Sequence, residues 1–132
     1  MADRELTDVE VVQAIYAAMA ASDLDRIFEL LDPEVVITQD DRLPWGGRHV
    51  GHDGFATFGL ALTGAVASAV TIESVFRADG EVIQVGRTAG TTQAGGVAFD
   101  IPEVHRWTVR DGRAVRAHFA IDTDAMLDAL RG

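Results

Sequence analysis

Two residues that could carry acid/base chemistry lie close together in a run of alternating apolar and polar side chains. Between residues 97 and 110 every second residue is apolar, except where Glu103 and His105 interrupt this face. Residues two apart on one strand face lie about 7 Å apart, close enough to share a water or a substrate atom. Histidine titrates near neutral pH and burial raises the proton affinity of a glutamate, so the pair could transfer protons.

The same two residues have a second interpretation that involves no chemistry. Glu103 could lie in water at the mouth of a cavity, and His105 could be a core histidine with a hydrogen-bond partner. Burying either group without a partner is costly. Each therefore needs a protein partner, a water or a ligand.

Two further polar residues could orient a substrate. Arg87 shares a predicted strand face with Val85 and Ala89, and a guanidinium on the inner face could pair with Glu103 or bind an anionic or carbonyl oxygen. A shift of one residue would turn it to solvent instead. Gln39 ends the apolar side of the first predicted strand, where its amide could bind a ligand carbonyl or hydroxyl, or the backbone.

The other histidines give weaker signals. His118 falls on the strand face opposite Phe119, which favours the surface or a subunit interface. His49 and His52 lie three residues apart, but no acidic third ligand has a diagnostic spacing. We therefore expect no metal site.

Composition excludes several classes of function. The 132 residues contain no cysteine, all eleven basic residues are arginine, and the net charge is -10. Such a surface repels phosphate, so we expect neither nucleic acid nor a membrane as a partner. No phosphate loop or nucleophile elbow is present, and no cofactor is expected. The first residues lack a basic segment followed by an apolar one, which favours a cytoplasmic protein.

The elements that must position these residues form one expected domain over residues 1–132. Thr7 and Glu10 have capping-box spacing before an apolar stripe of helical period, and a second helix is predicted to end at Pro33. A strand over residues 35–39, a loop over residues 40–50, a helix over about residues 52–62 and a loop over residues 65–69 follow.

From Val70 onward the apolar period changes from 3.6 to 2, which predicts a meander of four strands before a short last helix. Asp79-Gly80 and Asp111-Gly112 are strong hairpin signals. The pattern predicts an α+β fold in which a curved antiparallel sheet wraps around helices and forms a cone with an internal pocket. A bend or bulge near Pro102 is expected to curl the sheet.

The pocket is expected to bind a small hydrophobic molecule. Its predicted lining adds apolar side chains to Gln39 and Arg87, with Trp45 as a candidate lid in a glycine-flanked loop and Trp107 as a core residue. The remaining predicted lining residues are Ile15, Met19, Phe55, Phe58 and Phe119.

Segments along nearly the whole chain resemble the nuclear transport factor 2-like (NTF2-like) superfamily, in particular its SnoaL-like and ketosteroid isomerase-like members. The resembling segments are Val11–Gln13, Ser22–Asp25, Leu30–Val35, Gly47–Gly51 and His105–Arg113. The resemblance implies the cystatin-like cone, a small hydrophobic ligand and a homodimer formed through the outer face of the sheet.

The catalytic motifs of these relatives are matched only in part. Ile15, with Tyr16 beside it, stands where the steroid isomerases have a tyrosine. Gln39 replaces their general-base aspartate, and His105 replaces their oxyanion-hole acid. His105 also matches the histidine of the SnoaL-like cyclases, but Phe119 stands at their aspartate.

Arg87 looks like the third-strand arginine of limonene epoxide hydrolase-like members, whose carboxylate positions hold Ala89 and Phe119 here.

The resulting expectation is a SnoaL-like enzyme that moves protons on an apolar carbonyl compound, in an isomerisation, cyclisation or dehydration. His105 would be the acid/base or oxyanion donor, and Glu103 the second acid/base. The alternative is a non-catalytic module that binds a small hydrophobic ligand.

Overall fold

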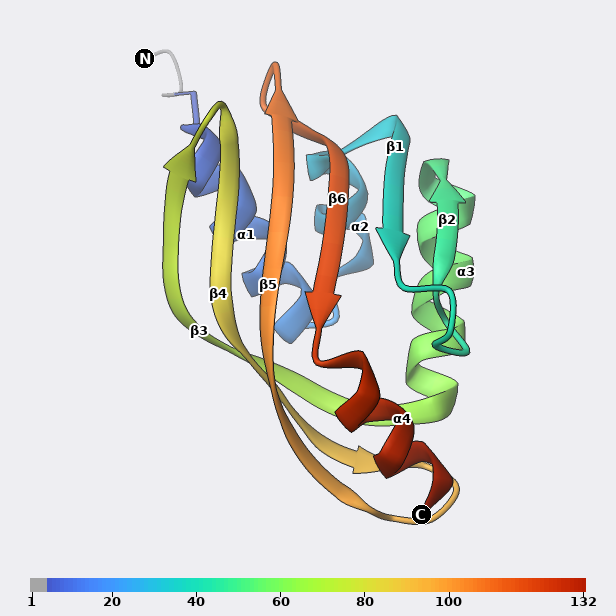
Figure 1. The fold of residues 1–132 in the computed structure, drawn as a ribbon. Helices are drawn as coiled ribbons and strands as arrows, with labels where there is room; N and C mark the ends of the chain where they lie inside the picture. Colours follow the sequence, from blue (N-terminus) through green and yellow to red (C-terminus); the bar gives the residue numbers. More distant parts are fainter. Residues whose placement is uncertain (1–4) are drawn as a thin grey trace.

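The computed structural model describes residues 5–132, and this part of the chain forms four helices and six strands (Figure 1). Residues 1–4, on which the expectation of a missing leader largely rests, lie outside the described residues. None of the described helices is both long and apolar enough to span a membrane. In chain order the elements are α1 (Asp8–Ala20), α2 (Leu24–Leu30), β1 (Leu31–Gln39), β2 (Gly47–Val50), α3 (Gly51–Ala65), β3 (Val66–Ala78), β4 (Glu81–Thr92), β5 (Ala98–Arg110), β6 (Arg113–Ile121) and α4 (Thr123–Arg131).

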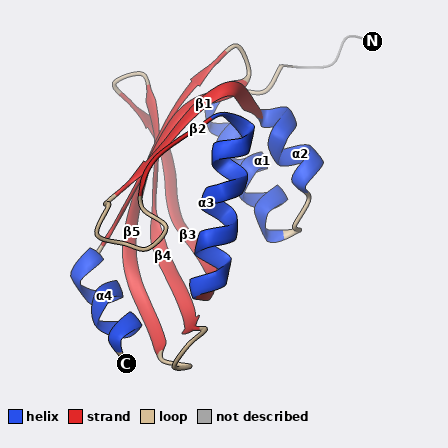
Figure 2. Ribbon diagram, turned by 90° about the vertical axis from the view of Figure 1, so that its right-hand side faces the viewer, coloured by secondary structure: helices blue, strands red, loops and turns tan. Residues whose placement is uncertain are grey.

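The strands form a single curved sheet in the order β2-β1-β6-β5-β4-β3. Helices α1, α2 and α3 lie together on one side of this sheet, and α4 lies beside its lower end (Figure 2). Neighbouring strands are antiparallel except β1 and β6, which run parallel. The predicted α+β fold with a sheet curved around helices is therefore confirmed, with one parallel pair that the prediction did not include.

Helix α1 begins where the capping box predicts. The Thr7 hydroxyl accepts from the Glu10 amide and the Glu10 carboxylate accepts from the Thr7 amide, which satisfies two of the free donors of the first turn. Val11, Val12 and Ile15 are fully buried against the sheet. This packing holds α1 over the strands that carry the polar inner residues.

Two segments expected to be loops contain regular structure. Residues 47–50 form β2, which pairs with β1 and has only four residues of mixed exposure, too few for an alternation signal. Helix α3 extends to Ala65, and β3 starts at Val66, so residues 65–69 hold no loop. This part of β3 is an exposed edge strand with no apolar alternation to reveal it.

The sheet curves at glycines of β4, and the register between β4 and β5 continues through Pro102 without a bulge. A side chain at Gly86 would overlap the carbonyl oxygen of Thr71, and one at Gly90 would overlap that of Ala67. Only glycine allows β3 and β4 to approach and coil in this way. A register shift at Glu73 of β3 adds to the curvature.

A second register shift places Val115 of β6 out of the pairing with β5. The buried face of β6 therefore reads Ala114, Ala117 and Phe119, and Val115 is only half buried. Strict alternation would place Val115, Ala117, Phe119 and Ile121 on one face, and the bulge removes Val115 from it. Both predicted hairpin turns are present, with positive φ at Asp79-Gly80 and Asp111-Gly112.

The glycine account of the curvature predicts a contrast between two substitutions. Gly90→Ala should lower the free energy of unfolding by roughly 1–3 kcal/mol, because the backbone must move to admit the methyl group. Gly64→Ala in α3, where nothing lies near the added atom, should raise it by about 0.5–1 kcal/mol. Urea unfolding of the two variants checks this, and equal effects of the two changes would contradict the account.

Candidate active site

Strand β5 turns Glu103 and His105 to the inner face of the sheet. Glu103 is 2% exposed and His105 is 7% exposed, between the buried residues Ile101 and Trp107. The alternation along residues 97–110 therefore predicted this face correctly. Glu103 borders a surface hollow, but its side chain is almost completely shielded from solvent, so both residues need partners inside the protein.

Tyr16 of α1 provides the central partner. Its hydroxyl oxygen lies 2.6 Å from His105 Nδ1 and accepts hydrogen bonds from Trp107 Nε1 at 3.0 Å and Gln84 Nε2 at 3.2 Å. Trp107 and Gln84 can only donate through these nitrogens, so the phenolic proton is left for His105 Nδ1. A neutral His105 must then carry its own proton on Nε2.

The Nε2 side of His105 faces the carboxylate of Glu103. Nε2 lies 3.4 Å from Glu103 Oε1, longer than an ordinary N–H···O hydrogen bond. A hydroxyl, an imidazole and a carboxylate thus follow one another across the inner face. Of these contacts, the Nε2–H one is the loosest and the easiest to exchange for a substrate atom.

Gln84 of β4 joins the three groups. It is fully buried and pairs in register with His105, so its side chain lies beside the imidazole. Its Nε2 donates to Glu103 Oε2 at 2.5 Å and also lies 3.2 Å from His105 Nδ1. Its carbonyl oxygen Oε1 has no hydrogen-bond partner among the described residues.

Burial sets the protonation of this network. Burial, with a smaller contribution from the charge of His118, lowers the pKa of His105 to about 3. Burial raises the pKa of the Glu103 carboxyl, an effect partly offset by the hydrogen bond from Gln84. The pKa of Tyr16 is also raised, mainly by burial. At neutral pH both Tyr16 and His105 are therefore uncharged.

Aromatic rings enclose the imidazole. The His105 ring centroid lies 4.5 Å from that of Phe119 and 6.0 Å from that of Tyr16. Trp107 packs edge-on against Tyr16, and Phe58 of α3 packs against Phe119. This shell keeps the polar groups in an apolar environment, where their hydrogen bonds are stronger than in water.

The other predicted apolar residues lie in or against the same core. Ile15 is fully buried, Phe55 and Phe58 are buried, and Met19 is half buried. The helix position that reaches the inner polar groups is Tyr16, however, and not Ile15.

Arg87 does not join the site, which corrects the expectation that it faces the pocket. On β4 the buried positions are Val82, Gln84, Gly86 and Thr88, so Arg87 lies on the outer face. There its Nε donates to Asp100 Oδ1 at 2.6 Å. The sequence of β4 does not reveal which face is buried, because the inner face carries Gln84, Gly86 and Thr88 whereas the outer face carries the apolar residues Ile83 and Val85.

Gln39 and Trp45 bind one another and form part of the core. The Trp45 indole Nε1 donates to Gln39 Oε1 at 2.9 Å, and Trp45 is 2% exposed. In this structure Trp45 is therefore a packed residue instead of the expected lid. Neither residue has a hydrogen bond to the Tyr16 and His105 network among the described residues.

The remaining histidines bind backbone or outer-face groups. His49 Nε2 lies 3.1 Å from the carbonyl oxygens of Trp45 and Gly46, and His52 Nε2 lies 2.9 Å from that of Leu31. His118 lies 2.7 Å from the Thr38 hydroxyl, on the outer face as predicted. The described residues contain no cluster of three or more potential metal ligands.

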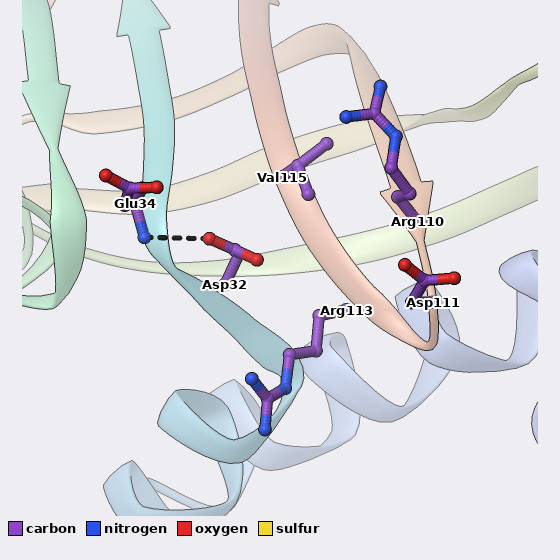
Figure 3. A pocket seen from close by; sticks show the side chains of 6 residues that line it. All are labelled: Asp32, Glu34, Arg110, Asp111, Arg113 and Val115. Carbon is purple, nitrogen blue, oxygen red and sulfur yellow. Dashed lines mark hydrogen bonds between the residues drawn. The ribbon is translucent and has the colours of Figure 1, made fainter.

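Two surface hollows are found in the described part of the chain, and His105 lines neither of them. One, of about 540 Å³, lies at the end of the sheet beside the β5–β6 hairpin, where the charged side chains spread apart (Figure 3). Its lining residues are Asp32, Glu34, Arg110, Asp111, Arg113 and Val115. The other, of about 300 Å³, lies mainly on the outer face, bordered by Val85, Pro102, Val104 and Ala120 together with Glu73 and Glu103.

Sequence reasoning missed two members of the network. Tyr16 belongs to the buried stripe of α1, but helical period does not say which buried residue reaches the sheet. Gln84 could have been found only through the register of β4 on β5, because it pairs directly with His105.

The sequence comparison identifies the family. The sequence model of the SnoaL-like domain matches residues 12–117. This chain belongs to the SnoaL-like domain family. No curated protein sequence matches it significantly.

Solved structures share the SnoaL-like fold at low sequence identity. An NTF2-like protein from Burkholderia thailandensis aligns with a TM-score of 0.89 and 23% identity, over 96% of this chain and 99% of that one. TerC, crystallised with polyporic acid, aligns with a TM-score of 0.86 and 23% identity over 95% and 98% of the two chains. A putative polyketide cyclase from Pseudomonas putida aligns with a TM-score of 0.79 and 19% identity, over 94% of this chain and 98% of that one. These likenesses confirm the NTF2-like fold of the SnoaL-like chain.

The buried, neutral His105 predicts how stability depends on pH. Unfolded histidine has a pKa near 6.5, whereas the folded value is about 3. Between these values the unfolded chain binds a proton that the folded one does not, so acidification lowers the free energy of unfolding by about 1.4 kcal/mol per pH unit from this group. Glu103 acts in the opposite sense, since its raised pKa favours the folded state at low pH.

Denaturant unfolding at pH 6.5 and pH 5 of the native protein and of His105→Gln measures this contribution. The variant should lose much less stability on acidification than the native protein. His118→Gln, which changes a more exposed histidine, should remove a smaller part of the dependence. An unchanged dependence in His105→Gln would show that His105 is not held neutral by burial.

Proposed function

We propose that this SnoaL-like protein catalyses proton transfer on an apolar carbonyl compound, as in an isomerisation, cyclisation or dehydration. The observation that carries the proposal is the ordered sequence of Tyr16 hydroxyl, His105 imidazole and Glu103 carboxylate inside an aromatic shell. No charged side chain other than Glu103 takes part in the described hydrogen bonds of this network. Such an environment suits a neutral, largely apolar substrate.

Glu103 is the base in this proposal. A carboxylate whose pKa is raised by burial is a stronger base than one in water, because the proton affinity of the buried group is higher. It takes the proton from the carbon next to the substrate carbonyl. The electron pair of that C–H bond moves to the carbonyl oxygen, which becomes an enolate oxygen.

His105 stabilises that oxygen as a hydrogen-bond donor. Its Nε2–H is loosely held by Glu103 at 3.4 Å, so it can turn its hydrogen bond to the enolate. Where the substrate is β,γ-unsaturated, the enolate extends over the double bond, and return of the proton from Glu103 to the γ-carbon moves the double bond into conjugation and completes an isomerisation. Tyr16 does not touch the substrate; it is a positioning residue that binds Nδ1 and so keeps the histidine proton on Nε2.

A non-catalytic binding module is the second candidate, and one feature favours it. Both ring nitrogens of His105 already face protein groups, and the hydroxyl of Tyr16 has three partners. A network satisfied to this degree would also serve as a rigid polar end wall for an apolar ligand.

Hydrogen exchange at carbon separates the two candidates without knowledge of the natural substrate. In deuterated water the native protein should accelerate exchange of the α-protons of apolar ketones such as 2-tetralone, 1-indanone and 1,3-diphenylpropane-1,3-dione, followed by proton NMR. His105→Gln should lower the rate by roughly 10²-fold or more, the usual contribution of such a group.

The matched control is His118→Gln, the same substitution on the outer face of the next strand, which should exchange at the native rate. Saturable binding of these ketones without accelerated exchange would support the binding module. Exchange that survives unchanged in His105→Gln would remove His105 from the mechanism.

A further inference from the structure

Gln84 is bonded at only one end of its amide. Its Nε2 is shared among Glu103 Oε2 at 2.5 Å, the Tyr16 hydroxyl at 3.2 Å and His105 Nδ1 at 3.2 Å. Its Oε1 is buried and has no partner in the described part of the chain. A buried acceptor without a donor lowers the stability of the folded protein, and most buried polar atoms in native proteins have a hydrogen-bond partner. This asymmetry needs an explanation beyond simple structural support.

The free end of the amide packs over Gly86, the next inner residue of β4. A side chain at position 86 would collide with Gln84 Oε1 as well as with the Thr71 carbonyl. Glycine therefore leaves the amide in place beside Glu103. The atom at the free end of the amide therefore lies close to the Gly86 backbone. Contacts to the Gly86 α-protons can show whether that atom is the oxygen or the NH₂ group.

Glu103 needs two different partners if it cycles between protonated and unprotonated forms. A carboxylate accepts hydrogen bonds, so it needs an N–H donor, whereas a carboxylic acid must donate its proton to an acceptor. The titratable groups that face Glu103 are His105 on its own strand and, through Gln84, Tyr16 of α1. Glu73 of β3 borders the outer hollow that Glu103 also lines. None of these groups is an acceptor placed as close to the carboxyl as the Gln84 amide.

An amide holds both kinds of group at one position, separated by half a turn about its last side-chain bond. Turning the Gln84 amide breaks no hydrogen bond of Oε1 among the described residues. It does withdraw Nε2–H from the Tyr16 oxygen and from His105 Nδ1, while the Trp107 N–H continues to point at the Tyr16 oxygen. The turn would place Oε1 about where Nε2 now lies, within hydrogen-bond reach of Glu103 Oε2.

We propose that Gln84 is an amide adapter, which presents its N–H to the Glu103 carboxylate and, after a half turn, its carbonyl oxygen to the Glu103 carboxylic acid. This inference rests on the proposed function, since only a base that takes up and releases a proton needs both partners. Gln84 is thus a positioning residue for the proton on Glu103. Gly86 leaves the space in which the amide rests.

NMR of the ligand-free protein tests the adapter directly. The Glu103 carboxyl carbon is titrated in protein labelled with ¹³C at glutamate and assigned by its loss in Glu103→Gln, while ¹⁵N labelling follows the glutamine side-chain amides. Above the Glu103 midpoint, the Gln84 amide protons should show nuclear Overhauser contacts to the His105 and Trp107 rings. Below it, these should weaken and contacts to the Gly86 α-protons should appear.

Gln39 is the matched control, because its Oε1 is already bound by Trp45 and its amide has no reason to turn. Its contacts should stay unchanged over the same pH range. Gln84 contacts that also stay unchanged through the Glu103 titration would overturn the proposal. So would a reorientation whose midpoint differs from that of the Glu103 carboxyl.

Activity supplies a second readout that a merely structural residue would not give. Gln84→Met, which keeps the length but removes the amide, should lower the rate of α-proton exchange about tenfold or more while ketone binding is retained. Unchanged exchange in this variant would also overturn the adapter. If the native protein shows no exchange at all, the proposed function fails. The NMR titration of the ligand-free protein still decides separately whether the Gln84 amide turns with the protonation of Glu103.

Discussion

The hydrogen-bond network on the inner face of the sheet depends on which group accepts the single proton of the Tyr16 hydroxyl. Two N–H groups, one from Trp107 and one from Gln84, point at the phenolic oxygen and cannot accept a hydrogen bond in return. The proton must therefore go to His105 Nδ1, 2.6 Å away. This one constraint fixes the imidazole tautomer, turns Nε2–H toward Glu103 and gives the network its direction.

The fold meets that constraint through register and curvature. Direct pairing of β4 with β5 sets Gln84 beside His105 and Val82 beside Trp107, while β6 brings Phe119 against the other side of the imidazole. The capped start of α1 fixes the height of Tyr16 over these strands. Gly86 and Gly90 let β3 and β4 curl, so the edge of the sheet closes toward the helices. Each of these features acts at a distance from the reacting groups and yet decides where they lie.

Local patterns in the sequence were enough for the parts that depend on one strand or one turn. Strict alternation placed Glu103 and His105 on the buried face, and the two Asp-Gly pairs marked both hairpins. Arg87 was different, because the inner face of β4 holds Gln84, Gly86 and Thr88 and is less apolar than its outer face. Burial there is set by pairing with β5 and by the hydrogen bonds of the Gln84 amide nitrogen, which no hydropathy pattern records. The Val115 bulge likewise changes a face without any local signal.

Tyr16 illustrates the same limit on a helix. Ile15 and Tyr16 are both buried, and only the three-dimensional packing of α1 on β4 and β5 determines which of them reaches the histidine. The fold and the buried position of Glu103 and His105 could thus be predicted from the sequence, whereas the hydrogen bonds that connect them to Tyr16 and Gln84 could not. That connection gives the proposed chemistry its physical basis, since it leaves a neutral imidazole N–H beside a carboxylate.

The tautomer of His105 tests the central claim most directly. In ¹⁵N NMR of histidine-labelled protein at pH 7, the account predicts an unprotonated Nδ1 shifted by a strong accepted hydrogen bond and a protonated Nε2, with the Nδ1 signal changing in Tyr16→Phe. A His105 that is protonated on Nδ1, or on both nitrogens, at this pH would contradict it.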